Sequence, residues 1–592
     1  MHGKTTILEV AMEIALPYEF LEKVAARFGP DKARECAMST SVGGIGPLLR
    51  ERIVAQASAG VHVTGVTLLY DSVWIQTWHE WGQITLQKHS LAAEIRQILT
   101  KTDLGFPLTF FDGSTVNVEV WSTSYGGATV YFLSAPKITE VVYPGPKDMP
   151  AKTPNAYAWA HEIRLKQSWL VGRGALALLK KLEHKVDIAV LSETPTIFTH
   201  NRLMKDGFQN DPFFADTRYI FNDHTPLEYA HPIWDQLTID TVKVDSAIYV
   251  PTPAWNAQKK TLDITSLLVS VCEGVYGVAK KHGDVMRAMP SLREFAAKIK
   301  FVTNGVSRND WQAAELKEWE NLSDEALAEI RDRYKRKLLD WAWRHCRLWP
   351  TWAKENEKRR IVLWTRRITP YKRLDLVAKM LRNPEWKDRF LQTNIILFVG
   401  GRIHQQDNHA QDIVYDLLEM LNQDEVLQSR VIPIDNFNVW EAPILFRGAD
   451  AAVMIADDTR EASATGFMKA QMNGAAILAT PDGAVPEFVR FYPKGRVQAA
   501  SPGGAPEGAL PEHPNGFQIP YINGEPTPQG FLEALEQFDG AFREPAVVSG
   551  ITRSALSVTA NVDVARTTVE MKALYDEVLA LPRNLPETIK AE

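Results

Sequence analysis

The sequence predicts an α/β protein with two doubly wound domains that face one another across a cleft. From Ile361 onward, short apolar segments alternate with helical patterns, and a polar turn follows each apolar segment. This alternation is typical of a parallel sheet with helices on both faces. A chain of 592 residues has room for at least two domains with complete cores. Ligands of such sheets bind at the carboxyl ends of the strands, so we expect the site there.

The strands are predicted from apolar runs bounded by turn residues. In the second half they lie at 361–364, 394–399, 430–434, 451–456 and 475–480. In the first half they lie at 63–69, 187–191, 218–221 and 247–250, with a β-rich stretch whose turns fall at Asp112-Gly113 and Gly126-Gly127. We therefore place one domain at 1–303 and the other at 304–592. The last helical segment is expected to pack back onto the first domain, and the Gly/Pro-rich run 501–530 to form a long surface excursion.

Charge and cysteine content exclude several classes of protein. A net charge of −6 and a pI near 6.2 do not favour binding to nucleic acid or to an anionic membrane. Cys36, Cys272 and Cys346 lie far apart and lack the spacing of metal ligands, so we predict neither a disulfide scaffold nor a metal site. No leader or membrane span is expected, and a reducing, cytoplasmic location is the default.

The segment Glu461-Ala-Ser-Ala-Thr-Gly-Phe-Met-Lys469 follows the strand predicted at 451–456. A helix beginning near Thr465 and Gly466 would point free backbone N–H groups at an anion such as a phosphate. Apolar neighbours would favour a neutral Lys469 amine, which suits a covalently held cofactor. The neighbours expected from the sequence are Phe467, Met468 and Met472. Taken alone, such a lysine is more often a solvated surface residue.

A second motif, Trp364-Thr-Arg-Arg-Ile-Thr-Pro-Tyr-Lys-Arg373, gathers four cations on the turn after a strand. Arginine and lysine side chains in this number suit a site that holds two phosphates. A nucleic-acid patch or a solvated charge run is the alternative interpretation.

Two motifs in the first half are weaker. Gly43 and Gly44 stand immediately before a predicted helix, where backbone amides can approach a phosphate, although a plain tight turn is equally consistent. His224 follows the strand predicted at 218–221. A lone histidine is more often structural.

Taken together, and in this order along nearly the whole chain, the motifs resemble those of the glycogen/starch (α-glucan) phosphorylase family, in a short form that lacks an N-terminal regulatory extension. The resemblance implies the GT-B glycosyltransferase architecture of two Rossmann-like domains. It implies covalent pyridoxal 5′-phosphate on Lys469, with Arg366, Thr465 and Gly466 as further cofactor-binding residues. It implies catalytic roles for Arg367, Lys372, His224 and Glu461, and substrate-binding roles for Gly43, Gly44, Asn304, Ser463 and Tyr371.

By this resemblance the protein is expected to be a retaining α-glucan phosphorylase, with the cofactor phosphate as proton relay. Its partners would be inorganic phosphate, an α-1,4-glucan or maltooligosaccharide, and glucose 1-phosphate. The resemblance leaves open whether the protein forms a homodimer. Two positions depart from the family pattern: Pro195 stands in place of an acceptor-site histidine, and Ala464 in place of a glycine. Three alternatives remain: a nucleotide-sugar-dependent glycosyltransferase of the same architecture, a phosphorylase of another glycoside, and a non-catalytic carbohydrate-binding relative.

Overall fold

The computed structural model describes residues 5–150, 155–346, 358–493 and 511–582. The described chain divides into two compact units, each with its own sheet and hydrophobic core. The first unit contains Met1–Val73, His89–Thr303 and Thr567–Glu592, and the second contains Trp74–Lys88 and Asn304–Arg566. Among the described helices, none combines the length and the hydropathy needed to cross a bilayer.

The first unit is built on a mixed sheet with the strand order β15-β14-β10-β9-β1-β2-β8-β7-β5, and β6 pairs with β7. The strands from β15 to β8 run parallel, whereas β7 is antiparallel to β5, β6 and β8. Their bounds are β1 Thr6–Val10, β2 His62–Leu68, β5 Thr100–Lys101, β6 Phe106–Thr109, β7 Thr115–Tyr125, β8 Ala128–Ser134, β9 Ile188–Ser192, β10 Arg218–Asp223, β14 Gly274–Gly277 and β15 Ile299–Phe301. The strand order reverses between β1 and β9, and this is where open α/β sheets bind ligands.

The strands predicted at 63–69, 187–191 and 218–221 correspond to β2, β9 and β10, and the predicted β-rich stretch to β6, β7 and β8. The strand predicted at 247–250 is wrong, because Ser246–Tyr249 forms the helix α7. The Asp245 side chain accepts the Ala247 N–H at 3.0 Å and so initiates the helix, which the apolar residues alone did not indicate.

Helices cover this sheet, and a small antiparallel sheet lies beside it, in the order β11 (Ile233–Asp235), β13 (Thr261–Asp263) and β12 (Trp255–Asn256). The helices are α1 Tyr18–Phe28, α2 Pro30–Ser39, α3 Ile45–Ser58, α4 Ala92–Arg96, α5 Ala156–Lys181, α6 Gln236–Val242, α8 Ile264–Val271 and α9 Lys280–Ala288.

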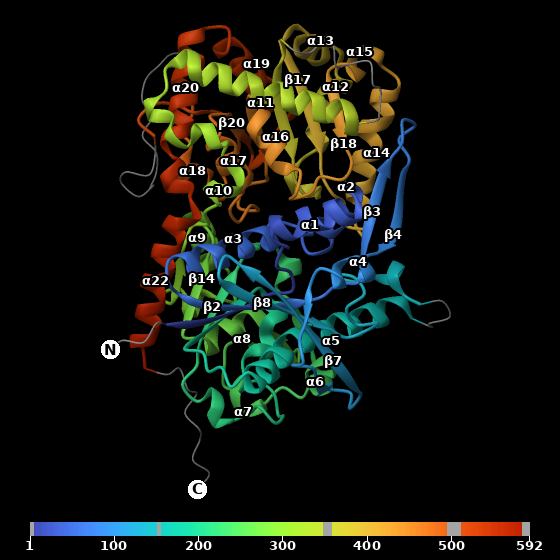
Figure 1. Cartoon of the computed structure of the whole chain (residues 1–592), viewed down its shortest axis with the longest axis vertical. Coiled ribbons are helices and arrows are strands. Elements are labelled where there is room, and N and C mark those ends of the chain that lie inside the picture. The colour runs from blue at the N-terminus through green and yellow to red at the C-terminus, as the bar shows by residue number, and fades with distance from the viewer. Residues whose placement is uncertain (1–4, 151–154, 347–357, 494–510, 583–592) are drawn as a thin grey trace. The chain divides into compact units, whose positions relative to one another are not determined.

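The helix α22 (Val564–Ala580) contacts the first unit from Thr567 onward, on the side of α9 and β14 (Figure 1). Its Thr567 hydroxyl donates to the Thr303 carbonyl at 3.0 Å, and the Tyr575 hydroxyl donates to the Gln56 side chain at 3.2 Å. The end of the chain thus packs on the core formed by its beginning.

The second unit has a parallel sheet of six strands in the order β18-β17-β16-β19-β20-β21. Its strands are β16 Arg360–Thr365, β17 Ile395–Gly400, β18 Val431–Ile434, β19 Ala451–Met454, β20 Ala476–Ala479 and β21 Gly516–Gln518. Numbered along the chain, this order is 3-2-1-4-5-6, that of dinucleotide-binding Rossmann sheets. The order reverses between β16 and β19, where the two predicted cation and lysine motifs leave the sheet. All five strands predicted in this half are present.

The helices of the second unit pack on both faces of its sheet. They are α10 Arg308–Trp311, α11 Asp324–His345, α12 Asp375–Arg382, α13 Pro384–Gln392, α14 Asn408–Asn422, α15 Glu425–Gln428, α16 Ala442–Gly448, α17 Gly466–Gln471, α18 Val485–Phe488, α19 Pro528–Ala541, α20 Pro545–Ser557 and α21 Thr559–Val562. Of the predicted surface excursion 501–530, residues 501–510 lie outside the described residues. The remainder is more regular than predicted, because it supplies β21, the strand pair β22 (Tyr521–Ile522) and β23 (Glu525–Pro526), and the start of α19.

A hairpin of β3 (Ser72–Trp78) and β4 (Ile84–Ser90) departs from the continuous first domain predicted at 1–303, because residues 74–88 group with the second unit. The Gln76 amide nitrogen donates to the Gly401 carbonyl at 2.6 Å, while its amide oxygen accepts the Ile403 N–H at 3.1 Å. Trp78 is buried in the core of the second unit. Local sequence patterns do not show which of two cores a hairpin joins.

Candidate active site

In the second unit, two predicted cations meet a predicted carboxylate at the point where the strand order reverses. Arg366 and Lys372 follow β16, and Glu461 follows β19. The Arg366 guanidinium is paired with Glu461 and also donates to the Ile455 carbonyl at 3.0 Å. The Lys372 Nζ lies 3.3 Å from Glu461 Oε2. Arg366 and Lys372 stand 95 and 89 positions before Glu461, and the three residues form what we call the cation–carboxylate cluster.

Electrostatics in this cluster differ from those of exposed side chains. Burial and the neighbouring Arg366 charge lower the pKa of Lys372 to about 7, and the attraction of Glu461 only partly offsets them. Burial raises the pKa of Glu461, but Arg366 and Lys372 outweigh it and hold that pKa below its usual value. Glu461 is therefore ionised, and Lys372 can gain or lose a proton near neutral pH.

Only part of the predicted cation motif is available to a ligand. Arg373 forms ion pairs with Asp375 at 3.1 Å, Asp457 at 2.8 Å and Glu525 at 3.4 Å. These carboxylates neutralise its charge. Arg367 is half-buried on the same turn, and Tyr371 lies against Lys372, whose Nζ is 5.2 Å from the centre of its ring.

Lys469 lies on α17, and its surroundings differ from those expected. Phe467, Met468 and Met472 are all fully buried in the core. The Lys469 Nζ instead lies 3.9 Å from the centre of the Trp311 ring and 5.9 Å from that of Phe446. Aromatic faces attract an ammonium group, so the Lys469 amine has aromatic neighbours that the sequence did not indicate.

Trp311 was not identified from the sequence. It comes from α10, is fully buried, and packs edge-on against Phe446 at 5.8 Å between ring centres. Its carbonyl accepts the side-chain N–H of Asn473 at 3.0 Å, and Asn473 in turn donates to the Lys469 carbonyl at 2.9 Å. The only sequence signal was its place shortly after Asn304.

The loop between β19 and α17 is shaped by residues further along the chain. Asp482 accepts the backbone N–H of Glu461 at 2.9 Å, which fixes this carboxylate relative to β20. A Cβ at Gly483 would lie 3.0 Å from the Ser463 carbonyl, so a side chain there would crowd the loop. Thr465 precedes α17 without capping it through its side chain, and Gly466 is the first helical residue.

Ala464 departs from the family pattern and adopts a backbone conformation that favours glycine, with φ of 65°. We expect Ala464→Gly to stabilise the protein by about 0.5–1 kcal/mol, since relief of left-handed strain exceeds the entropy cost of glycine. Urea unfolding would measure the change. Ala462→Gly in the same loop is the control, because Ala462 is not among the residues with positive φ, and it should lose about 0.5–1 kcal/mol. Equal destabilisation by both changes would contradict the prediction.

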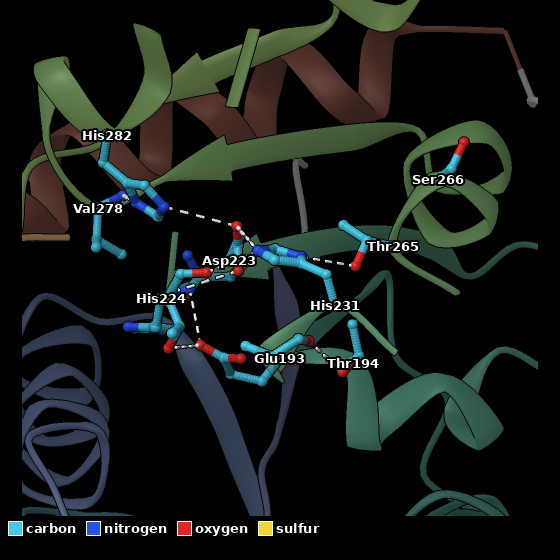
Figure 2. Close-up of polar contacts among 12 residues, drawn as sticks. Glu193, Thr194, Asp223, His224, His231, Thr265, Ser266, Val278 and His282 are labelled. Carbon is cyan, nitrogen blue, oxygen red and sulfur yellow. Dashed lines mark hydrogen bonds and ion pairs between the residues drawn. The ribbon is translucent and has the colours of Figure 1, made fainter. Parts of the chain in front are cut away.

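In the first unit, His224 lies directly after β10 within a dense polar network (Figure 2). Glu193 Oε1 accepts the His224 backbone N–H at 3.0 Å and the Thr225 hydroxyl at 2.9 Å. His231 Nε2 lies 2.8 Å from the Thr225 carbonyl and 3.9 Å from Asp223 Oδ2. The segment 222–225 is therefore held from two sides, and we call it the His224 segment.

A buried ion pair between Arg52 and Glu9 supports the His224 segment. Arg52 on α3 is paired with Glu9 and donates to Asn222 Oδ1 at 3.0 Å and to the Tyr276 hydroxyl at 2.8 Å. Burial, reinforced by the Arg52 charge, lowers the pKa of His224 to about 3. His224 is therefore neutral at physiological pH and can both donate and accept a hydrogen bond.

The predicted glycine motif also belongs to α3. Gly44 is the residue immediately before this helix, and the N–H of Val42 donates to the Glu13 carboxylate at 2.7 Å. A Cβ at Gly46 would lie 2.5 Å from the Thr40 carbonyl, so Gly46, not predicted from the sequence, is the glycine that packing requires. Gly43 and Gly44 remain predicted phosphate contacts.

Several predicted ligand residues carry buried polar atoms that the protein leaves without a partner. Within the described residues, no hydrogen-bond partner is found for the atoms His224 Nε2, Asn304 Nδ2, Ser463 Oγ and Arg366 Nε. Buried polar groups are satisfied in the great majority of cases. These four atoms are available to bond a polar ligand, and buried atoms without a partner occur elsewhere in the described residues as well, for example Thr67 Oγ1 and Trp364 Nε1. The described residues contain no cluster of three or more side chains suited to a metal ion.

The sequence matches a family model and individual relatives. A family model described as Carbohydrate phosphorylase matches residues 324–492, which include the cation–carboxylate cluster and Lys469. Glycogen phosphorylase from Aquifex aeolicus is 22% identical over 504 residues, covering 74% of this chain and 71% of that protein. Maltodextrin phosphorylase from Thermococcus litoralis is 23% identical over 510 residues, covering 74% of this chain and 58% of that protein.

The fold has a counterpart among solved structures. The catalytic domain of starch synthase IV from Arabidopsis thaliana, solved with ADP and acarbose, has a TM-score of 0.70 at 13% identity. The match covers 98% of this chain and 100% of that one. At this identity the likeness shows the fold alone, which is the GT-B glycosyltransferase fold of two Rossmann-like domains, as the sequence predicted.

Proposed function

We propose that the chain is a member of the carbohydrate phosphorylase family and that it catalyses the reversible phosphorolysis of an α-1,4-glucan to glucose 1-phosphate with retention of configuration. The observation that carries this proposal is the set of unpartnered buried atoms on His224, Asn304, Ser463 and Arg366. These residues come from four separate motifs, and each was predicted to bind sugar or a phosphate group.

The proposed roles follow from charge and protonation. Lys372 and Arg367 would bind the substrate phosphate, with the backbone amides of Gly43 and Gly44 as further donors and Tyr371 beside them. Neutral His224 and Asn304 would hydrogen-bond the 6-hydroxyl of the transferred glucosyl group. Ionised Glu461 would accept hydrogen bonds from its other hydroxyls, with Ser463 as a further contact. Cationic groups fixed in advance stabilise the charge that gathers in the transition state.

The residues present also fit pyridoxal phosphate. Lys469 offers a primary amine against the Trp311 ring, and Ser463 Oγ and Arg366 Nε are buried polar atoms that the protein leaves unbonded. Thr465 and Gly466 open α17, where backbone N–H groups face outward from the helix. We propose that Lys469 holds the cofactor covalently and that Arg366, Thr465 and Gly466 bind its phosphate. When bound, the cofactor would supply an acidic phosphate for proton transfer.

A nucleotide-sugar-dependent transferase of the same fold is the main rival. Such enzymes commonly carry a second glutamate eight positions after the first to hold ribose, and this position is Lys469 here. A phosphorylase of another glycoside shares all the phosphate chemistry, and a non-catalytic relative would show no transfer at all.

The proposed function is tested by transfer from glucose 1-phosphate, UDP-glucose or ADP-glucose to a panel of maltooligosaccharides, longer glucans and other glycosides, with release of phosphate or nucleotide measured. We expect glucose 1-phosphate alone to serve as donor. Pro195 is the second residue of the helical turn Thr194–Thr199 and has no side-chain hydrogen-bonding group. The loss of one neutral hydrogen bond is worth about 0.5–1.5 kcal/mol, so acceptor preference should shift by roughly 3- to 10-fold from that of relatives with histidine. Transfer from a nucleotide sugar would refute the proposal.

A further inference from the structure

Glu193 has a backbone conformation that a glutamate rarely adopts. It follows β9 directly, and β9 pairs with β1 at the point where the strand order of the first unit reverses. Its φ is 69° and its ψ is 161°, in a region occupied almost only by glycine. Its side chain is buried, with 9% of the residue exposed. Strain of this kind persists only where surrounding interactions enforce it, and such residues gather at functional sites.

The side chain and the backbone N–H of Glu193 make hydrogen bonds to the His224 segment, while its carbonyl accepts from Thr196. One carboxylate oxygen accepts both the His224 N–H and the Thr225 hydroxyl, and the Glu193 N–H donates to the Asn222 carbonyl at 3.0 Å. Figure 2 shows the Glu193 side chain extending toward His224. Two hydrogen bonds to one side-chain oxygen and one from the backbone N–H hold the segment at three points, and we call this arrangement the clamp.

On the other side of the segment, His282 and His231 complete the clamp, and both face Asp223 of the segment itself. Asp223 Oδ2 lies 3.6 Å from His282 Nε2, and His282 Nδ1 accepts the Val278 N–H at 3.2 Å. Burial raises the pKa of Asp223, but His282 and His231 outweigh it and keep that pKa below the usual value. The one polar atom of this segment's histidine that remains unbonded is Nε2 of His224, among the residues described.

We propose that Glu193 is a positioning residue that fixes His224 for the 6-hydroxyl of the transferred sugar. The inference rests on the proposed function, and it adds a residue and its task to that function. Glu193 does not touch the sugar in this scheme. Its carboxylate sets the backbone from which the His224 ring projects, and the strained conformation at position 193 is what directs the carboxylate toward that backbone.

The test changes both the residue at position 193 and the substrate, and measures how well each variant discriminates between two substrates. It compares kcat/KM for glucose 1-phosphate with that for 6-deoxyglucose 1-phosphate in the synthetic direction. In the parent, a site built to hydrogen-bond a hydroxyl should reject the analogue lacking it by about tenfold or more. Glu193→Gly suits the backbone and removes the clamp, so discrimination should fall to roughly 2- to 3-fold, mainly through the natural substrate. Glu193→Gln keeps an acceptor oxygen in place and should retain most of the discrimination.

Glu273 provides the matched control. It is also a buried carboxylate that accepts a backbone N–H of β10, that of Tyr219 at 2.8 Å, but it does so near the amino end of the strand, away from His224. Glu273→Gln should alter turnover of both substrates equally and leave discrimination unchanged. Should Glu193→Gly fail to fold, Glu193→Asn, which strains this backbone conformation no more than glutamate does but is too short to reach His224, should show the same loss.

The outcomes separate the two proposals. An active parent whose Glu193→Gly and Glu193→Asn variants keep full discrimination would overturn the role of Glu193 and leave the proposed function standing. The same holds if Glu273→Gln loses as much discrimination as they do. A parent that transfers no glucosyl group from glucose 1-phosphate would overturn the proposed function, and with it this inference.

Discussion

Borohydride reduction of the purified protein is expected to leave a pyridoxyl group on Lys469. This residue offers a primary amine in the last turn of α17, beside Trp311 and close in sequence to the unbonded Ser463 hydroxyl. Replacement by arginine keeps a cation against the aromatic ring but cannot form the covalent bond. Lys469→Arg should therefore lose cofactor absorbance and at least about a thousandfold in turnover, the scale on which groups that act as a unit fail together. Absorbance before and after reduction, with peptide mapping by mass spectrometry, measures both effects.

Lys372 is the internal control for this experiment. Its pKa of about 7 leaves much of it as a neutral, nucleophilic amine near neutral pH, so it can also react with an aldehyde. An adduct on Lys372 in place of Lys469 would contradict the assignment. Fully active protein without any pyridoxal phosphate would remove the cofactor from the proposal and strengthen the nucleotide-sugar alternative.

The second large effect is expected on inorganic phosphate. Lys372→Ala and Arg367→Ala should each raise the KM for phosphate by roughly ten- to hundredfold, since each removes a charge-assisted contact worth about 1.5–3 kcal/mol. The KM for glucan should change much less. Phosphate-saturation kinetics at fixed glucan measure the difference.

Arg373 serves as the matched control, because it is a neighbouring cation on the same turn whose charge is already taken up by Asp375 and Asp457. Arg373→Gln should leave the KM for phosphate near that of the parent. If Arg373→Gln affects phosphate as strongly as Lys372→Ala, the turn contributes only diffuse positive charge. Unchanged phosphate kinetics in both Lys372→Ala and Arg367→Ala would exclude the turn from the active site.

The pH dependence follows from the same geometry. Because the pKa of Lys372 is about 7, the protein loses this positive charge as pH rises through 7, and the KM for phosphate should increase. Lys372→Arg stays charged, so it should lack this limb, whereas the ionisation of phosphate itself affects both proteins alike. Rising pH weakens phosphate binding through Lys372, but it increases the stability of the folded protein. The folded pKa is below the ordinary 10.5, so the unfolded chain binds more protons between these values, and Lys372 makes the protein more stable as pH rises from 7 to 10.5.

The sequence by itself determined five of the six strands of the second sheet, three of the parallel strands of the first, and the motifs at their carboxyl ends. Apolar runs such as 395–400 are buried along their whole length, and their apolar composition is enough to predict this burial. The turns after these strands must carry polar residues, so the order of residues along the chain is enough to locate Arg366, His224 and Glu461. The prediction of a strand at 247–250 was wrong for a local reason, because an aspartate that caps a helix outweighed the four apolar residues.

The tertiary structure alone decided which of these residues work together. Glu461 meets Arg366 across 95 positions, and Lys469 meets Trp311, because neighbouring strands and helices of the second unit bring them into contact. The same applies to Arg373, which the sequence groups with the phosphate-binding cations but which Asp375 and Asp457 neutralise. Side-chain pairing depends on distances between segments, and local periodicity carries no information on these.

Glu193 shows the limit most clearly. In the sequence it is one acidic residue after a strand. Only the fold reveals that its backbone is strained and that its carboxylate holds the His224 segment, 31 positions away. Backbone strain arises when long-range contacts overrule a residue's own conformational preference, so the sequence around position 193 predicts the relaxed conformation and the three-dimensional structure imposes the other.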